Sequence, residues 1–264
     1  MADVSAVLRD LDAESEEVEA LVAGLDPPGW RTPTPASGWT IAHQIAHLAW
    51  TDAKALVAVR SPEAFTDEIA SALAVGETYV DEGAEDGARM PPDRLLDGWR
   101  RGRRELGAAL REVPAGTRLP WFGPPMSVAS MATARLMETW AHGQDIADAL
   151  GVRREPTRRL WHIARLGVRT RDFAFGVRGL AAPTEEFRVE LTAPDGDRWT
   201  FGPEDAPQRV TGSAHHFCLL VTQRIHRDDT DLSAVGEQAA TWLDIAQAFA
   251  GPPGPGRPRE GVRS

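Results

Sequence analysis

Apolar residues recur at helical spacing through the first two thirds of the chain. Positions such as Val4, Leu8, Leu11 and Val18 repeat with a period near 3.6, and acidic residues occupy the opposite face. The same kind of spacing predicts further helices over residues 40–59, 92–112, 127–150 and 157–176. Residues 62–90 are ambiguous between a helix and an irregular acidic segment. The pattern up to residue 178 therefore predicts an all-α bundle.

The pattern changes to a period of two from about residue 185. Apolar residues alternate around Val189 and again at Trp199 and Phe201, with the turn sequence Pro194-Asp195-Gly196 between them. This predicts a β-hairpin, followed by a short strand at 208–210, a helix that starts at Ser213 and a last helix over 233–249. We expect a mainly α protein with a helical bundle over 1–178, a linker near 179–185, and a small α+β domain over 185–250. That domain would hold a short antiparallel sheet and two helices, and the Pro/Gly-rich residues 251–264 would form a disordered tail.

Net charge, cysteine content and the lengths of apolar runs disfavour several classes of function. The formal net charge of −10 disfavours a nucleic-acid partner, which would favour a basic surface. Cys218 is the only cysteine, so an intrachain disulfide is impossible, and its apolar surroundings predict a buried thiol. No signal peptide is recognisable, and no apolar run approaches the roughly 20 residues of a membrane span. These features predict a cytoplasmic protein without a membrane partner.

Candidate chemistry lies on the helix predicted over residues 127–150. Glu138 and His142 are four residues apart and so share one face, where a carboxylate and an imidazole can hold one divalent metal. At about 100° per residue, Arg135 and Asp145 fall with them within an arc of about 80°, beside the apolar stripe. Such a strip of polar residues at the edge of the core suits a cleft between helices.

The helix predicted over residues 40–59 offers a third ligand. His43 and His47 share a face that flanks the core stripe, so they lie either in solvent or in a cleft between helices. His47 with Glu138 and His142 would form a site of the His₂Glu type, which leaves a fourth position for water or substrate. His43 could be a fourth ligand, a group behind the ligands, or a solvated neighbour.

These residues carry a family resemblance. The segment TIAHQIAHLA, after a Pro/Ser-Gly-Trp loop, and the segment ETWAHGQDIADAL resemble the two metal-binding motifs of the mycothiol-dependent maleylpyruvate isomerase family. This family belongs to the DinB-like metalloproteins, whose fold is a four-helix bundle, up-down with an extra helix. The resemblance covers nearly the whole chain. It implies a divalent metal, usually zinc, on His47, Glu138 and His142, and assigns no ligand role to His43.

The resemblance also implies an activity. A metal-activated thiol, mycothiol in the best-known members, would add to an electron-poor alkene or displace a leaving group on a small-molecule substrate. Arg224 sits where the resemblance suggests a catalytic arginine for a substrate carboxylate, with Arg135 as a second candidate. Asp145 would either accept an N–H from a ligand histidine or lie in solvent.

The loop before the second motif departs from the isomerase. Its Trp121, Phe122 and Met126 would either cover the core or line the pocket for the thiol. The loop and the surroundings of Arg224 resemble an actinobacterial branch known only as metal-binding, so the substrate and the thiol stay open. The alternatives are a thiol-independent hydrolase or lyase that uses a metal-activated water, and a non-catalytic metal-binding module. The oligomeric state is expected to be a monomer or a homodimer.

Overall fold

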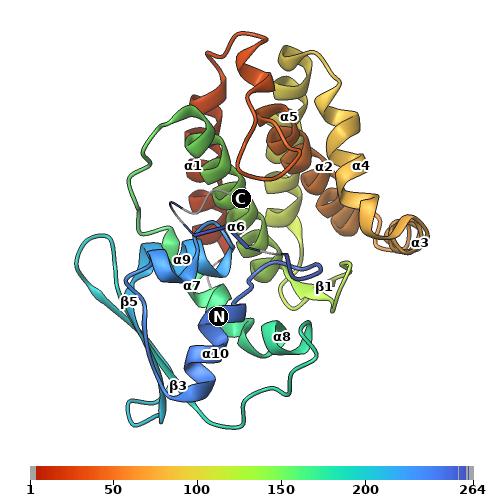
Figure 1. Ribbon diagram of the computed structural model, residues 1–264. Helices are drawn as coiled ribbons and strands as arrows, with labels where there is room; N and C mark the ends of the chain where they lie inside the picture. Colours follow the sequence, from red (N-terminus) through yellow and green to blue (C-terminus); the bar gives the residue numbers. More distant parts are fainter. Residues whose placement is uncertain (1–3, 255, 260, 262–264) are drawn as a thin grey trace. The chain divides into compact units, whose positions relative to one another are not determined.

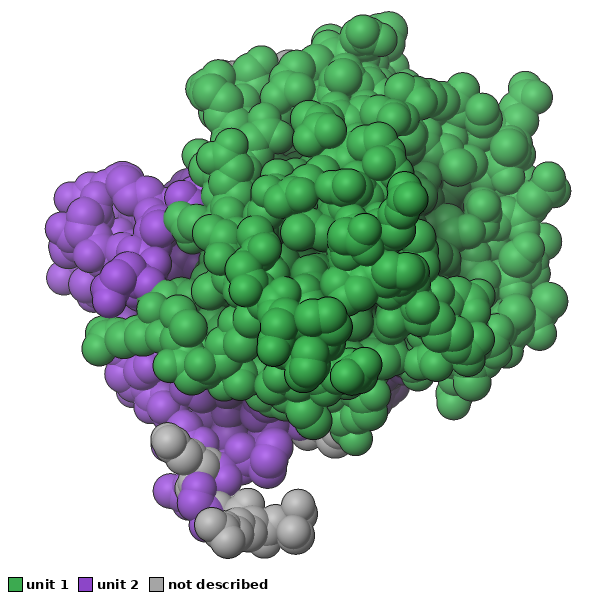
Figure 2. Space-filling view, turned by 90° about the horizontal axis from the view of Figure 1, so that it is seen from above, with its two compact units in different colours: residues 1–154 green, residues 155–264 purple. Residues whose placement is uncertain are grey.

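The protein divides into two compact units, residues 1–154 and 155–264 (Figure 2). The structure is a computed structural model, and it describes residues 4–254, 256–259 and 261. Figure 1 shows that the first unit is all helical apart from a small hairpin, and that the second combines helices with one sheet. Among the described residues, no helix has both the length and the apolar character needed to cross a membrane.

Four long helices form the bundle of the first unit. They are α1 (Val4–Val22), α2 (Ile41–Arg60), α5 (Pro92–Glu112) and α6 (Val128–Leu150). Helix α2 packs against both α5 and α6, and α6 packs against α1. The ambiguous segment 62–90 forms two shorter helices, α3 (Phe65–Val75) and α4 (Tyr79–Ala88), and α4 packs on α2. The strands β1 (Arg118–Leu119) and β2 (Met126–Ser127) pair just before α6. The predicted bundle with extra helices is confirmed.

The interior of the bundle has two apolar clusters with a polar layer between them. One cluster includes Ile45 and Leu48 of α2 and Ile146 of α6, and the other includes Ala55 of α2 and Ala132 of α6. Between those positions, both helices place buried polar side chains on their facing sides: His47, Thr51, Asp52, Arg135, Thr139, His142 and Asp145. The two apolar clusters stabilise the packing of α2 on α6, and so fix the distance across the polar layer.

Both site helices begin at capped positions. Ser127 Oγ accepts the backbone N–H of Ser130 at 3.2 Å and so caps the N-terminus of α6. At the start of α2, the backbone N–H of Thr40 donates to His43 Nδ1 at 3.2 Å. This closes a capping box with a histidine in the place usually taken by glutamate or glutamine. These caps set where each helix starts, and with it which residues face the polar layer.

The described residues of the second unit form four α-helices and a four-stranded sheet. Its helices are α7 (Leu160–Arg169), α8 (Arg171–Gly176), α9 (Ala214–Val221) and α10 (Glu237–Ile245). The strands β3 (Phe187–Thr192), β4 (Arg198–Phe201), β5 (Gln208–Ser213) and β6 (Ser233–Val235) lie in the order β4-β3-β5-β6. The predicted hairpin, the third strand and the cap at Ser213 are all present. The last helix, predicted over 233–249, is shorter, because residues 233–235 pair with β5 as strand β6.

The sheet is mixed, which corrects the prediction of an antiparallel sheet. Strand β3 pairs antiparallel with β4 but parallel with β5. The hairpin returns the chain to the end at which β3 starts, and β5 then begins beside that end and runs in the same direction. The turn at Gly202 needs glycine, because its φ is +78° and an added Cβ would lie 1.9 Å from the Phe187 carbonyl oxygen.

The division between the units differs from the boundary expected at residue 178. The buried face of α7, with Leu160, Ile163, Ala164 and Gly167, belongs to the second unit, where α7 packs on α9. An apolar stripe shows that a helix is covered and leaves open which element covers it. The tail expected to be disordered, 251–264, includes residues 255, 260 and 262–264, which lie outside the described residues. Within the described part, the Gly254 carbonyl accepts a hydrogen bond from Arg178.

Candidate metal centre

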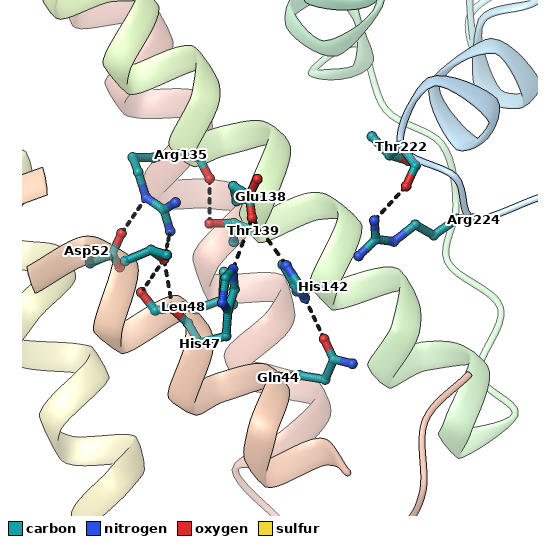
Figure 3. A network of polar contacts seen from close by, with 11 residues as sticks. Gln44, His47, Leu48, Asp52, Arg135, Glu138, Thr139, His142, Thr222 and Arg224 are labelled. Carbon is teal, nitrogen blue, oxygen red and sulfur yellow. Dashed lines mark hydrogen bonds and ion pairs between the residues drawn. The ribbon is translucent and has the colours of Figure 1, made fainter. Parts of the chain in front are cut away.

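Three side chains from two helices converge in the polar layer. His47 of α2 and Glu138 and His142 of α6 each offer one ligand atom, and these atoms lie within 4.8 Å of one another. The Nε2 atoms of both histidines are 3.2 Å from Glu138 Oε2 (Figure 3). Both imidazoles are buried, and the glutamate side chain is 20% exposed. The structure thus brings together the three residues that the sequence predicted as ligands.

The electrostatics of Glu138 suit a metal ligand. Burial by itself would raise the pKa of this carboxyl, but hydrogen bonds that the His142 and His47 rings donate when they are protonated outweigh burial and hold the pKa well below its usual value. Glu138 is therefore a carboxylate near neutral pH. A metal ion needs its ligands deprotonated, and this carboxylate meets that condition before any ion binds.

A buried hydrogen-bond network lies behind His142. Gln44 of α2 is fully buried, and its Oε1 is 2.5 Å from His142 Nδ1. A carbonyl oxygen can only accept, so Nδ1 carries a proton, and in the neutral ring Nε2 is left with its lone pair facing Glu138. His142 Nε2 and Glu138 Oε2 are then two acceptor atoms 3.2 Å apart, and a cation bound to both would stabilise this arrangement. The donor set fits a divalent metal on His47, Glu138 and His142, with an imidazole–imidazole–carboxylate composition typical of catalytic zinc sites.

His43 serves another purpose. Its Nδ1 accepts the Thr40 backbone N–H, so its Nε2 carries the proton and donates to Glu85 Oε2 at 2.8 Å. The histidine therefore caps α2 and fastens it to α4. Both ring nitrogens are engaged in these contacts, which explains why His43 stays outside the ligand group.

Arg135 lies in the polar layer but faces a different partner. Its Nε donates to Asp52 Oδ1 at 2.9 Å, and its Nη2 donates to Thr51 Oγ1 at 2.6 Å. The side chain is only 2% exposed. Thr51 donates in turn to the backbone carbonyl of His47. Arg135 thus joins α6 to α2 beside the ligands, and its predicted contact with substrate stays a prediction. Asp145, the other polar residue predicted on this helix, is fully buried.

Two tryptophans surround the imidazoles. The ring centroid of Trp39 lies 5.3 Å from that of His47 and 5.9 Å from that of His142, and Trp50 lies 6.4 Å from His47. Trp39 Nε1 also donates to Asp81 Oδ1 at 2.9 Å, which ties the loop before α2 to α4. The ligands therefore have an aromatic wall made by the loop and by α2 itself.

The three residues predicted to bind the cofactor lie in a connected aromatic cluster and on the core. Trp121 and Phe122 pack on Phe65, and Phe122 meets the edge of Tyr79, which in turn contacts Trp50. Trp121 and Met126 cover the apolar cluster at the α6 start. Covering the core is thus one of their roles, and their contact with a thiol stays a prediction.

A hollow of about 560 Å³ opens beside the aromatic wall. Trp39 and His43 line it, together with carboxylates of α4: Asp81, Glu82, Glu85 and Asp86. Arg89 is the one basic residue among its lining residues. The lining of this hollow is therefore acidic, and the hollow meets the aromatic wall at Trp39.

Arg224, the predicted catalytic arginine, belongs to the second unit. It follows α9, and its Nη1 donates to the Thr222 carbonyl at 2.5 Å. The preceding residue, Gln223, has a φ of +59°, which marks a sharp turn after the helix. The role assigned to Arg224 stays a prediction.

The sequence analysis did not identify Gln44, Trp39 and Trp50 as residues of the site. Gln44 precedes His47 by three residues and so shares its helical face, a spacing that could have flagged it. The aromatic contacts of Trp39 and Trp50 depend on how the loop folds over α2, and no periodicity reports that.

Two family descriptions and two curated relatives match this chain. Residues 11–147 match the family described as mycothiol maleylpyruvate isomerase N-terminal domain, and residues 183–235 match one described as wyosine base formation. Uncharacterised proteins of two Mycobacterium tuberculosis strains, CDC 1551 and H37Rv, are each 58% identical over 257 residues, which is 97% of this chain and 100% of theirs.

Two solved structures have a similar fold. They are crystal structures of the mycothiol-dependent maleylpyruvate isomerase and of a histidine-to-alanine variant of it, each with a TM-score of 0.62 and 17% identity. The match covers 88% of this chain and 92% of the isomerase chain. At this identity the likeness concerns the fold.

Proposed function

Since this chain belongs to the mycothiol maleylpyruvate isomerase N-terminal domain family, we propose that it is a metal-dependent enzyme that activates a small thiol for attack on an electrophile. The observation that carries the proposal is the convergence of His47, Glu138 and His142 within 4.8 Å. Three protein ligands of this composition are typical of catalytic zinc, whereas structural zinc sites use four. We therefore propose Zn²⁺ as the metal.

The single cysteine of the chain is not a suitable thiol nucleophile. Its single cysteine, Cys218, is fully buried in the second unit, and burial raises the pKa of its thiol well above the usual value. The attacking thiol therefore comes from outside the chain, and mycothiol is the thiol named for the structurally similar isomerase. A bound divalent ion would supply the positive charge that favours thiolate over thiol near neutral pH.

The protein residues then have distinct tasks. Glu138 keeps its negative charge, the two imidazoles would offer Nε2 to the ion, and the indoles of Trp39 and Trp50 lie against the His47 ring. A thiolate activated in this way would add to an electron-poor double bond, and rotation about the resulting single bond followed by loss of the same thiolate would isomerise the bond. Alternatively, the thiolate would displace a leaving group, which departs with the electrons of the broken bond. Arg224 is proposed to bind a polar group of the substrate.

For a substrate that approaches the centre past Trp39, the acidic hollow favours transfer of the thiol to a neutral or weakly charged electrophile. The carboxylates of Asp81, Glu82, Glu85 and Asp86 outnumber Arg89 there, and a substrate with several carboxylates would be repelled. Among the reactions open to this centre, we therefore place S-transfer ahead of isomerisation of a dicarboxylic acid.

The proposal is tested by zinc and thiol binding together. Purified protein is stripped of metal and titrated with Zn²⁺, and its melting temperature is then measured with and without mycothiol. We expect stoichiometric zinc, and a rise in melting temperature with mycothiol only when zinc is present. His142→Ala should lose both effects. His43→Gln is the matched control, because this histidine contacts Glu85 rather than the ligand group and should leave zinc binding intact.

The outcomes separate the candidate classes. Zinc binding without any effect of mycothiol would favour a hydrolase or lyase that needs no thiol. If wild-type protein fails to retain zinc, or if His142→Ala retains it equally well, the proposal of a metal-dependent enzyme is wrong.

A further inference from the structure

We propose that Gln44 is a positioning residue, aimed by Thr34, that holds His142 in the tautomer presenting Nε2 to the metal. The inference rests on the metal centre of the proposed function. It adds a chain of three hydrogen bonds that begins in the loop before α2 and ends at one ligand, and it assigns a reason for the complete burial of a glutamine in the bundle.

The first step is the direction of the Thr34 hydroxyl. Thr34 Oγ1 lies 2.9 Å from the backbone carbonyl oxygen of Trp39 and donates to it, because a carbonyl can only accept. The hydroxyl has one proton, so its remaining contact, to Gln44 Nε2 at 2.8 Å, must be one in which it accepts. The amide nitrogen of Gln44 therefore faces Thr34.

The second step follows from the planarity of the amide. With its nitrogen toward Thr34, Gln44 turns its Oε1 toward His142 Nδ1, at 2.5 Å. The opposite amide orientation would put an N–H₂ group against Nδ1 and a carbonyl against a hydroxyl that already donates elsewhere. The hydrogen-bond network thus selects the orientation in which Gln44 accepts from His142.

The third step is the consequence for the metal. A ring that donates from Nδ1 has its lone pair on Nε2, which is the atom 3.2 Å from Glu138 Oε2. Outer partners of this kind fix the tautomer and the ring plane of a ligand histidine and raise its basicity. Because Gln44 is on α2 and His142 is on α6, the bond also ties the two helices together at the height of the centre.

The two imidazole ligands are not equivalent in this respect. Within the described part of the chain, the buried Nδ1 of His47 has no hydrogen-bond partner. His142 is therefore the ligand whose tautomer and direction are fixed by the fold. Removing the Gln44 carbonyl should weaken the centre through His142, without touching any ligand atom.

The test measures zinc affinity by competition with a chromophoric chelator. Gln44→Leu keeps a similar side-chain volume and removes the acceptor, and we expect a loss of roughly 10- to 100-fold in zinc affinity. Gln44→Glu restores the acceptor toward His142 but loses the donor toward Thr34, so it should recover part of that loss. Gln144→Leu is the matched control. It makes the same chemical change on the helix of His142, where the amide donates to Asp148 instead, and should leave the affinity unchanged.

A second measurement observes the tautomer of His142 directly. In zinc-loaded wild-type protein, the His142 Nδ1 proton should give a downfield, slowly exchanging resonance in ¹H–¹⁵N spectra, and Nε2 should show the shift of a coordinated nitrogen. In Gln44→Leu the slow exchange should be lost. Coordination of wild-type His142 through Nδ1, or an unchanged zinc affinity in Gln44→Leu, would overturn the assignment.

These results can be told apart from failure of the proposed function. If wild-type protein binds no zinc, the metal centre itself is wrong. If wild type binds zinc and His142→Ala does not, while Gln44→Leu binds as tightly as wild type, only the positioning role is refuted.

Discussion

The buried pair of Arg135 and Asp52 gives the sharpest prediction about the polar layer. Arg135 is 2% exposed at its side chain and Asp52 is 7% exposed, and the guanidinium Nε is 2.9 Å from the carboxylate. Arg135→Met leaves the Asp52 carboxylate buried without its partner. Losing one partner of such a pair costs about 3–5 kcal/mol in the free energy of unfolding. At about 2–4 °C per kcal/mol, the melting temperature should fall by roughly 6–20 °C.

A double variant separates a structural role of Arg135 and Asp52 from a catalytic one. Arg135→Met combined with Asp52→Ala removes both charges, and replacing a buried ion pair by apolar groups is often close to neutral. We expect the double variant to regain most of the lost stability in urea unfolding followed by the helical circular dichroism signal. We also expect its zinc affinity to stay near the wild-type value, because neither residue belongs to the ligand group.

Two results would refute this reasoning. A single Arg135→Met variant that loses less than about 1 kcal/mol would mean that Asp52 finds water or another donor. A double variant that folds as stably as wild type but loses activity, with zinc still bound, would instead assign Arg135 to the substrate, the role that its place on the polar strip first suggested.

Three further predictions concern the rest of the molecule. Arg100 lowers the pKa of Glu19 through a hydrogen bond, so the stability this provides is present above the unfolded pKa of about 4.3 and is lost as pH falls through the lower folded value. Glu19→Gln should therefore flatten the fall of unfolding free energy below about pH 4.5, and identical curves for both proteins would contradict the pairing. Gly143→Val should cost on the order of 1–3 kcal/mol in thermal or urea unfolding, because even a Cβ there would lie 2.5 Å from Val18 Cγ2; an unchanged stability would show that the contact between α1 and α6 can relax. Cys218 should react with a thiol reagent only after denaturant is added, since it is buried and its thiol pKa is raised; rapid labelling of the native protein would show that the site opens.

Features that depend on neighbours along the chain could be predicted from the sequence. The period of 3.6 located the long helices, and the period of two located the hairpin around Pro194-Asp195-Gly196. Glu138 and His142 could be paired because four residues along one helix return to the same face. The caps at Ser127 and Ser213 follow from local side-chain chemistry in the same way.

Sequence periodicity shows which face of a helix or strand is buried, but not which other element covers that face. An apolar stripe on α7 says that the helix is covered, and the covering partner turned out to be α9 of the second unit. Alternation along β5 is the same for either direction of pairing, and its parallel register with β3 depends on where the hairpin returns the chain.

The features of the metal centre likewise fall into those that the sequence predicted and those that helix packing decided. Local spacing along α6 determined that Glu138 and His142 share a face, and the family resemblance pointed to His47 as the third ligand. Only the packing of α2 on α6 decided that His47 reaches Glu138, that Gln44 lies behind His142, and that Arg135 pairs with Asp52. These contacts join residues more than 80 positions apart, and they exist because two apolar clusters hold the helices in register on either side of a polar layer. The sequence by itself determined the helices and one edge of the centre, and the tertiary structure decided which side chains meet there.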